Sequence, residues 1–299
     1  MPDSSTLAAI PVIDSIAAVA GRYDAFVIDL WGVLHDGAKA YPGAVEALRR
    51  LKGLGKRIGL LSNAPRRTAF VAAHAARLGV TPELYDRLLT SGEDAWRHLD
   101  ERRDPWYAAL GRRAYPIMSR ERDGSFLDGL DLELVADPDA ADFILATGVN
   151  GPRDRVEDFA PVLDRAAARG LPLVCVNPDL EVVRLNGERE ICAGMIALAY
   201  EARGGLVRYH GKPHRPVYDT LLAQLGVGDG KRVLGIGDSL RTDVAGAAAA
   251  GFDALLVTGG IHAEELGGAA GMAPDPGHLA AVCARAGQRP VAAIPAFVW

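Results

Sequence analysis

The segment Asp24-Ala-Phe-Val-Ile-Asp29-Leu30 decides the fold, because an unbroken run of apolar residues leads directly into a carboxylate. Such a run predicts a strand that is buried on both faces of a sheet. Similar runs occur at 57–62, 88–91, 231–237 and 253–258. Helical patterns separate them, at 42–54, 65–78, 92–102 and 242–250. Alternating strands and helices predict an α/β fold, a doubly wound parallel sheet with right-handed crossovers.

The middle of the chain forms a second α/β set. Strands are expected at 142–147 and 171–176, and helices at 156–168 and 191–203. The segment 101–131 is rich in Arg, Asp and Gly and is interpreted as a transition zone. We therefore expect an inserted domain at 104–206, within a core domain made of 1–103 and 207–299.

Composition excludes several classes of protein. The 299 residues suggest about two domains. The net charge of -5 argues against a nucleic-acid binder, and the absence of a stretch of about 20 apolar residues argues against a membrane span. The three cysteines form no CxxC pair, and the first 14 residues do not resemble a secretory leader, so a cytoplasmic location is expected.

Polar residues follow several of the predicted strands, where ligands bind in open parallel sheets. They are Asp29, the pair Ser62-Asn63, and the segment from Gly237-Asp238 to Asp243; Gly211-Lys212-Pro213 opens a further helix. Each alone is ordinary turn or cap chemistry. Together, carboxylates, an ammonium group and a hydroxyl suit phosphoryl transfer, in which a carboxylate is the nucleophile and Mg²⁺ binds hard oxygen atoms.

These motifs, in this order, resemble the haloacid-dehalogenase-like (HAD) superfamily, class IIA, the group of 4-nitrophenylphosphatase and pyridoxal phosphatase relatives. The resemblance extends from about Tyr23 to Ile261. It implies a Rossmann-like core with an inserted α/β cap. It also implies Mg²⁺-dependent hydrolysis of small phosphorylated metabolites through an aspartyl-phosphate.

The resemblance implies a role for each motif. Asp29 is expected to be the nucleophile and a metal ligand, Asp238 a second ligand, and Asp243 a support for the water shell of the metal. Ser62, Asn63 and Lys212 are expected to bind the phosphoryl oxygens. In the cap, Asn177-Pro178-Asp179 and Ala193-Gly194 resemble elements that face the site, which makes Asn177, Asp179 and Gly194 the candidates for substrate contacts.

Trp31 departs from the family pattern, in which a second Asp is the general acid and base. The metal contact at this position is expected from the backbone carbonyl of Trp31, so metal binding survives the change. The lost proton transfer costs about 10²–10⁴-fold in rate. We hypothesise that His35 partly replaces the acid, because histidine titrates near neutral pH. The alternative is that His35 is a polar loop residue facing solvent.

Two other functions stay open at this stage. Trp31 favours a weak or inactive relative that binds a phosphorylated ligand as a sensor or scaffold. Metal-free chemistry at carbon, such as dehalogenation, is disfavoured because it has no use for Lys212 with the acidic pair Asp238 and Asp243. The expected partner is a small phosphorylated metabolite, with neither nucleic acid nor membrane, and the class makes a homodimer possible.

Overall fold

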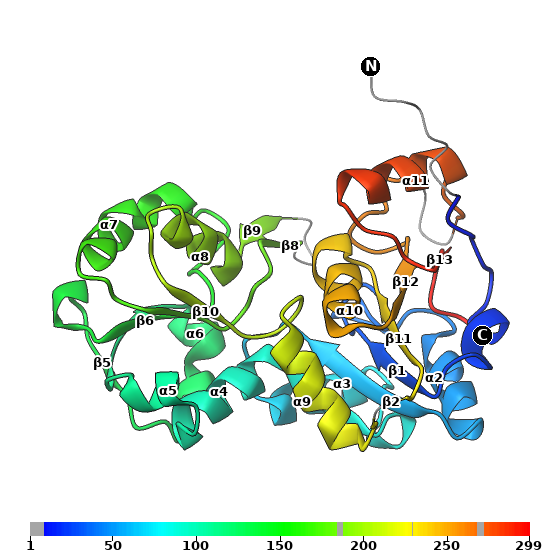
Figure 1. Cartoon of the computed structure of the whole chain (residues 1–299), viewed down its shortest axis with the longest axis horizontal. Helices are drawn as coiled ribbons and strands as arrows, with labels where there is room; N and C mark the ends of the chain where they lie inside the picture. Colours follow the sequence, from blue (N-terminus) through cyan, green and yellow to red (C-terminus); the bar gives the residue numbers. More distant parts are fainter. Residues whose placement is uncertain (1–8, 184–187, 229, 268–271) are drawn as a thin grey trace. The chain divides into compact units, whose positions relative to one another are not determined.

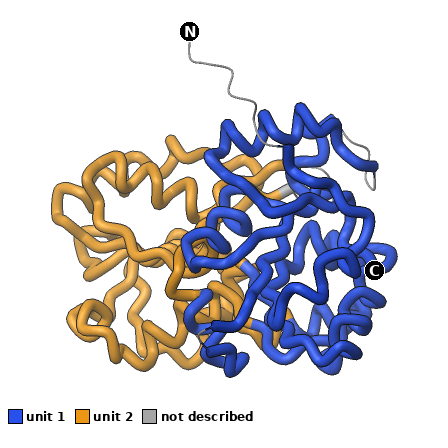
Figure 2. Tube along the Cα trace, turned by 45° about the vertical axis from the view of Figure 1, so that its right-hand side comes forward, with its two compact units in different colours: residues 1–62, 72–88, 218–299 blue, residues 63–71, 89–217 orange. Residues whose placement is uncertain are grey.

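The computed structural model describes residues 9–183, 188–228, 230–267 and 272–299 (Figure 1). By their contacts these residues form two compact units (Figure 2). Unit 1 comprises the described parts of Met1–Ser62, Ala72–Leu88 and Tyr218–Trp299, and unit 2 comprises those of Asn63–Val71 and Leu89–Val217. This division does not test the domain boundaries expected at 104 and 206, which stay predictions.

A six-stranded sheet forms the centre of unit 1, in the order β13-β12-β11-β1-β2-β3. Its strands are β1 (Ala25–Ile28), β2 (Arg57–Ser62), β3 (Arg87–Thr90, which ends in unit 2), β11 (Val233–Gly237), β12 (Asp253–Val257) and β13 (Ala292–Ile294). Strand β1 lies between β11 and β2 and is parallel to both, with Ile28 opposite Ile236 and Leu60. All residues of β1 are buried, as the unbroken apolar run predicts.

Helices α9 (Arg215–Leu225) and α10 (Ala245–Ala250) lie against the sheet (Figure 1). Two glycines of the sheet face them. Gly59 and Gly235 both pair with Val27, so they lie in one row on one face. A Cβ atom at Gly59 would lie 2.8 Å from Leu225 of α9. One at Gly235 would lie 2.9 Å from Ala247 of α10. The missing side chains therefore let both helices approach the sheet closely.

The described residues of unit 1 contain further helices and helical turns. They are α1 (Ala17–Ala20), α2 (Ala44–Gly53), α3 (Thr68–Arg77, which begins in unit 2), the 3-10 turn η1 (Pro82–Leu84), the π-helical turn η5 (Leu240–Val244) and α11 (Pro276–Arg285). Helix α3 begins three residues after the predicted start, and α11 was not predicted.

Unit 2 contains a five-stranded sheet, in the order β10-β7-β6-β4-β5, and a two-stranded antiparallel sheet of β8 and β9. The strands are β4 (Arg113–Ile117), β5 (Glu133–Leu134), β6 (Phe143–Ala146), β7 (Leu173–Cys175), β8 (Glu181–Val183), β9 (Arg189–Ile191) and β10 (Val207–Tyr209). The helices are α4 (Ser91–Glu101), α5 (Pro105–Ala109), α6 (Arg120–Asp123), α7 (Ala160–Ala168) and α8 (Ala193–Glu201), with 3-10 turns η2 (Gly124–Leu127), η3 (Pro138–Ala140) and η4 (Val156–Phe159).

The larger sheet of unit 2 is buried on both faces. In β6, Ile144 and Ala146 belong to one apolar cluster, whereas Phe143 and Leu145 belong to another. Alternate residues of β6 pack into the two clusters on opposite faces of the sheet, so the whole strand is apolar. This agrees with the second α/β set that the sequence predicts here, and it adds that the sheet is covered on both faces.

The fold class agrees with the prediction, and the structure adds strands to it. The segment 101–131, interpreted as a transition zone, contains β4, which pairs with β5 and β6. The tail 289–299 supplies β13 at the edge of the first sheet. None of the helices among the described residues combines the length and apolar character needed to cross a membrane.

Candidate functional site

Three carboxylates gather at one edge of the sheet in unit 1. Asp29 follows β1, Asp238 follows β11, and Asp243 lies in η5 (Leu240–Val244), a single π-helical turn. Oxygen atoms of the three side chains lie within 4.8 Å of one another, and all three residues are buried. Because β1 and β11 are adjacent and parallel, their carboxyl ends meet at the same edge.

Backbone groups fix two of these carboxylates. The Ile261 N–H donates to Asp238 Oδ2 at 2.8 Å, and the Ser239 N–H donates to Asp243 Oδ2 at 3.0 Å. Gly32, with φ of +82°, leaves the space that Asp238 fills, since a Cβ atom there would lie 2.0 Å from Asp238 Oδ2. The loop after β1 is thus shaped around a carboxylate of the neighbouring strand.

The donor set of this cluster fits a hard divalent cation. Mg²⁺ prefers carboxylate oxygen and water, and it is commonly held by one or two carboxylates together with phosphate oxygen. Asp29, Asp238 and Asp243 supply oxygen only. The structure therefore brings together the three carboxylates that were predicted to bind the metal or support its water shell, whereas the contact from the Trp31 carbonyl stays a prediction.

Ser62 is the last residue of β2, which pairs with β1, and it is buried. The predicted hydroxyl thus lies at the same edge of the sheet as Asp29, one strand away. Its role in binding phosphoryl oxygen stays a prediction.

A second group of predicted site residues lies in unit 2 and centres on Asn63. The Lys212 N–H donates to Asn63 Oδ1 at 2.8 Å, and Asn63 Nδ2 donates to the Lys212 carbonyl at 3.0 Å. Gly211, with φ of +98°, makes this contact possible, because a Cβ atom there would lie 2.5 Å from Asn63 Oδ1. Asn63 therefore holds the backbone of Lys212 on both sides, and the Lys212 residue is buried.

The predicted cap residues join this group. Asn63 Nδ2 also donates to Asp179 Oδ1 at 2.8 Å, and the Asp179 N–H donates to Asn177 Oδ1 at 3.0 Å. The Gly194 N–H donates to the Asp179 carbonyl at 3.2 Å, and a Cβ atom at Gly194 would lie 2.2 Å from the Pro178 carbonyl oxygen. Residues far apart in sequence are thus connected by hydrogen bonds within unit 2.

The loop after Asp29 carries Trp31 and His35. Trp31 is 41% exposed, whereas His35 is buried. Their rings meet edge to face with centroids 6.0 Å apart. The Gly37 N–H donates to His35 Nδ1 at 3.1 Å, which places the ring proton on Nε2. His35 Nε2 has no hydrogen-bond partner among the described residues.

Burial, and secondarily the nearby His74, lowers the pKa of His35 from 6.5 to about 4. The imidazole is therefore neutral at pH 7. It lacks the second ring proton, which an imidazolium would donate as a general acid. His35 is not a solvent-facing loop residue either, which was the alternative hypothesis, because it is buried. The structure therefore disfavours His35 as the general acid, and mutation is the test of that hypothesis.

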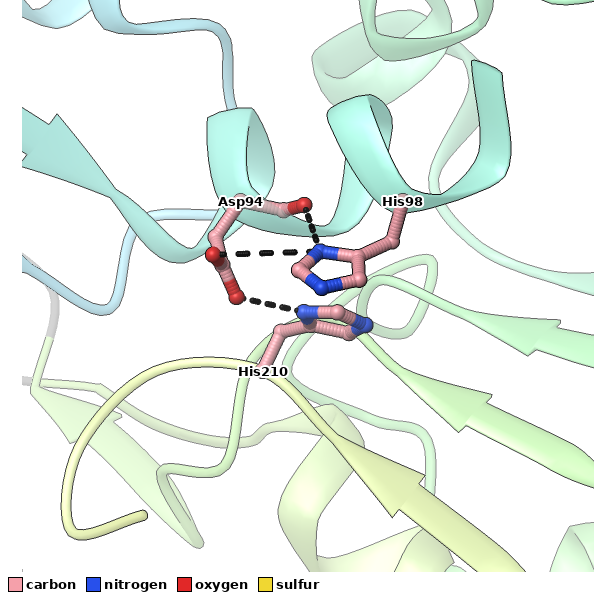
Figure 3. A group of neighbouring side chains, drawn as sticks. All are labelled: Asp94, His98 and His210. Carbon is pink, nitrogen blue, oxygen red and sulfur yellow. Dashed lines mark hydrogen bonds and ion pairs between the residues drawn. The ribbon is translucent and has the colours of Figure 1, made fainter. Parts of the chain in front are cut away.

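A third polar group, which was not predicted from the sequence, lies in unit 2 (Figure 3). His210 Nδ1 donates to Asp94 Oδ2 at 2.6 Å, and the Tyr107 hydroxyl lies 2.5 Å from His210 Nε2. His98 Nδ1 donates to the Asp94 carbonyl at 2.8 Å. Burial lowers the pKa of His210, although the Asp94 carboxylate opposes this shift.

The arrangement of ligand atoms in Asp94, His98 and His210 would accept a metal ion. However, both ring nitrogens of His210 already have partners in the protein, so the group is a satisfied hydrogen-bonded network. The i, i+4 spacing of Asp94 and His98 on one helix was the signal available in the sequence. Nothing in the sequence showed that His210 would lie against them.

Two family models match the chain. Haloacid dehalogenase-like hydrolase matches residues 26–132, and HAD-hydrolase-like matches residues 209–282. These ranges contain the four predicted motifs.

Relatives cover most of the chain. Human chronophin is 30% identical over 250 residues, which is 81% of this chain and 83% of chronophin. D-glycerol 3-phosphate phosphatase of Mycobacterium tuberculosis is 28% identical over 261 residues, covering 82% of this chain and 65% of that protein. A crystal structure of a haloacid dehalogenase-like hydrolase from Brucella suis is 35% identical, with a TM-score of 0.79, over 96% of this chain and all of that chain.

The fold, the carboxylate cluster and these likenesses agree, and the relative from M. tuberculosis is named as a phosphatase. The protein thus belongs to the haloacid dehalogenase-like hydrolases, in class IIA, the group of its phosphatase relatives.

Proposed function

We propose that the protein hydrolyses small phosphate monoesters with Mg²⁺ and that the phosphoryl group passes through Asp29. The observation that carries this proposal is the gathering of the buried Asp29, Asp238 and Asp243 at the ends of β1 and β11. A carboxylate next to a cation site suits nucleophilic attack on a phosphate that carries negative charge.

In this mechanism an oxygen of Asp29 attacks phosphorus while the bond to the leaving oxygen breaks. Water then attacks the same phosphorus atom and releases Asp29 as a carboxylate. Asp29, Asp238 and the carbonyl of Trp31 would hold Mg²⁺, with Asp243 supporting its water shell. The ion, when bound, offsets negative charge on the phosphoryl oxygens.

Lys212, Ser62 and Asn63 complete the proposal. The ammonium group of Lys212 and the hydroxyl of Ser62 are assigned to the phosphoryl oxygens, whose charge they neutralise. Asn63 acts chiefly on Lys212, because it binds that residue's N–H and carbonyl. Asn177, Asp179 and Gly194 are assigned to the leaving group of the substrate.

Solved relatives support the choice of cation. Glycerol phosphate phosphatase from M. tuberculosis has been crystallised in complex with magnesium and with calcium. That protein is 26% identical to this chain, with a TM-score of 0.61 over 89% of this chain and 79% of that chain in the magnesium complex. Both cations take oxygen ligands, which is the donor set described above.

Turnover of 4-nitrophenyl phosphate tests the proposal. Activity should disappear with a chelator, return with added Mg²⁺, and fall at least about 10³-fold in Asp29→Asn, which keeps the shape of the side chain. Activity that survives the chelator, or an Asp29→Asn variant as active as the natural protein, would contradict it.

A phosphate sensor is the second candidate, and Trp31 is the observation that favours it. An exposed indole stands where the family pattern has its general acid. Binding of a phosphate analogue such as vanadate, without turnover of any ester in a broad panel, would support this function over hydrolysis.

A further inference from the structure

Trp31 is the one exposed residue between positions 25 and 35. Its neighbours Leu30 and Gly32 are buried, and so is Asp29, two residues away. Consecutive Cα atoms are 3.8 Å apart, so the Cα atoms of Trp31 and Asp29 lie within ~7 Å of each other. A large apolar side chain is thus exposed beside the proposed nucleophile.

The loop holds this indole in place. Gly37, with φ of +91°, lies against the ring, since a Cβ atom there would be 2.4 Å from Trp31 Cη2. His74 Nε2 donates to the Gly37 carbonyl at 3.0 Å, and the Gly32 N–H donates to the His35 carbonyl at 3.0 Å. The buried ring of His35 supports the indole edge to face. A ring fixed before binding loses little freedom when a ligand stacks on it.

Neither the Asp36 carboxylate nor the His35 imidazole of the same loop is a ready proton donor for a leaving group. Of its carboxylates, Asp36 Oδ1 accepts the N–H groups of Ala38 and Lys39 at 2.9 Å each, so that side chain is used within its own turn. His35 is buried beneath Trp31 and accepts from Gly37. A leaving group that is itself acidic departs without such a donor, whereas an alkoxide does not.

We propose that Trp31 forms a leaving-group subsite that selects aryl and heteroaryl phosphate monoesters. This inference rests on the proposed function. The indole stacks on the flat ring of the leaving group, and such rings carry their oxygen as an acidic hydroxyl. In the step itself, the bond between Asp29 and phosphorus forms and the bond between phosphorus and the aryl oxygen breaks. The aryl oxygen keeps the electron pair and takes its proton from solvent water.

Three phosphate esters of similar size distinguish the effect of a flat leaving group from the effect of an acidic leaving group. Phenyl phosphate has a flat ring and an acidic leaving group, and benzyl phosphate has a flat ring and an alkoxide leaving group. Cyclohexyl phosphate has neither. With Mg²⁺ present, KM should be lower for both flat esters than for cyclohexyl phosphate, and kcat should be high only for phenyl phosphate.

Substitutions at Trp31 then test whether the differences in KM and kcat among the three esters arise from its side chain. Trp31→Ala should raise KM about tenfold for the two flat esters and leave that for cyclohexyl phosphate unchanged, whereas Trp31→Phe should retain most of the preference. Trp31→Asp introduces a carboxyl group and should raise kcat about 10- to 100-fold for the two esters with alkoxide leaving groups. Leu54→Ala removes an exposed apolar side chain after α2 and is the matched control.

A binding measurement tests the subsite independently of the reaction. Phenylphosphonate should quench the tryptophan emission of Asp29→Asn, and cyclohexylphosphonate should not; adding Trp31→Phe should remove the quenching. Equal KM changes for all three esters, or quenching that persists without Trp31, would overturn the subsite. Absence of turnover for every ester would instead contradict the proposed function, and the phosphonates would still decide the subsite.

Discussion

His35 shows how burial of one imidazole makes the stability of this protein depend on pH. Its pKa falls from 6.5 to about 4, chiefly through burial, with His74 adding to the shift and Asp36 opposing it. The unfolded chain binds a proton near pH 6.5, and the folded chain binds it only near pH 4. The stability contributed by the neutral ring is therefore complete above pH 6.5 and is lost as the pH falls toward 4.

This shift predicts a pH-dependent free energy of unfolding that a substitution removes. Between pH 7.5 and pH 4, His35 should account for a loss of about 3 kcal/mol, at 1.36 kcal/mol for each unit of pKa. Urea denaturation at both pH values measures it, and His35→Gln should reduce the difference by that amount. His278→Gln, at an exposed position in α11, is the control. A pH dependence unchanged in His35→Gln would contradict the assignment.

Asn63 holds the backbone of Lys212 through hydrogen bonds of its side chain. Asn63→Ala would leave the Lys212 N–H and carbonyl without these hydrogen bonds, and each lost partner of a buried group costs about 1–3 kcal/mol. We expect a lower melting temperature and a kcat/KM for 4-nitrophenyl phosphate reduced at least about tenfold. Asn63→Asp keeps the acceptor for the Lys212 N–H and should lose less activity. An equal loss in both variants would exclude this positioning role.

At the scale of elements, α4 and the segment after β10 are joined by a hydrogen bond between side chains. Asp94 lies in the first turn of α4, and His210 follows β10 directly. The bond is 2.6 Å long and buried, and His210 precedes Gly211 and Lys212. The network with Tyr107 therefore fixes the start of the segment that carries Lys212.

Asp94→Ala should lower the free energy of unfolding by about 1–3 kcal/mol, because His210 Nδ1 loses its acceptor. Asp94→Asn still offers an oxygen atom and should lose less. Chemical denaturation measures both, and Asp100→Ala, at an exposed position of the same helix, is the control. If Asp94→Ala were as stable as the control, the network would have no structural role.

The sequence predicted those elements whose apolar pattern is set by two buried faces. Strands β1, β2, β11 and β12 lie where unbroken apolar runs occur, because neighbours cover both faces of the sheet. Strand β4 was missed, since its residues Arg113, Tyr115 and Pro116 are exposed or only partly buried. For the site, the sequence predicted the residues that lie next to strand ends. It did not predict the contacts of His210, because the partners of this residue come from distant parts of the chain.

At the scale of the whole molecule, glycines set the distance between the helices and the sheet of unit 1. A methyl group at Gly59 would lie 2.8 Å from Leu225 and 2.9 Å from Leu221, so Gly59→Ala should cost about 1–3 kcal/mol through overpacking. Thermal unfolding measures the effect. Gly53→Ala, at a helical glycine whose Cβ atom would meet nothing within 4 Å, should be neutral or stabilising. Equal melting temperatures for the two variants would refute the close approach.

The central position of β1 has a consequence for synthesis on the ribosome. One neighbour of β1, the strand β11, begins about 200 residues later in the chain. At about 5–20 residues per second, the nascent chain carries β1 with one row of amide groups unpaired for about 10–40 s. Such an edge is a template for pairing with other chains. We therefore expect truncated chains that end before residue 233 to aggregate or to be retained by chaperones.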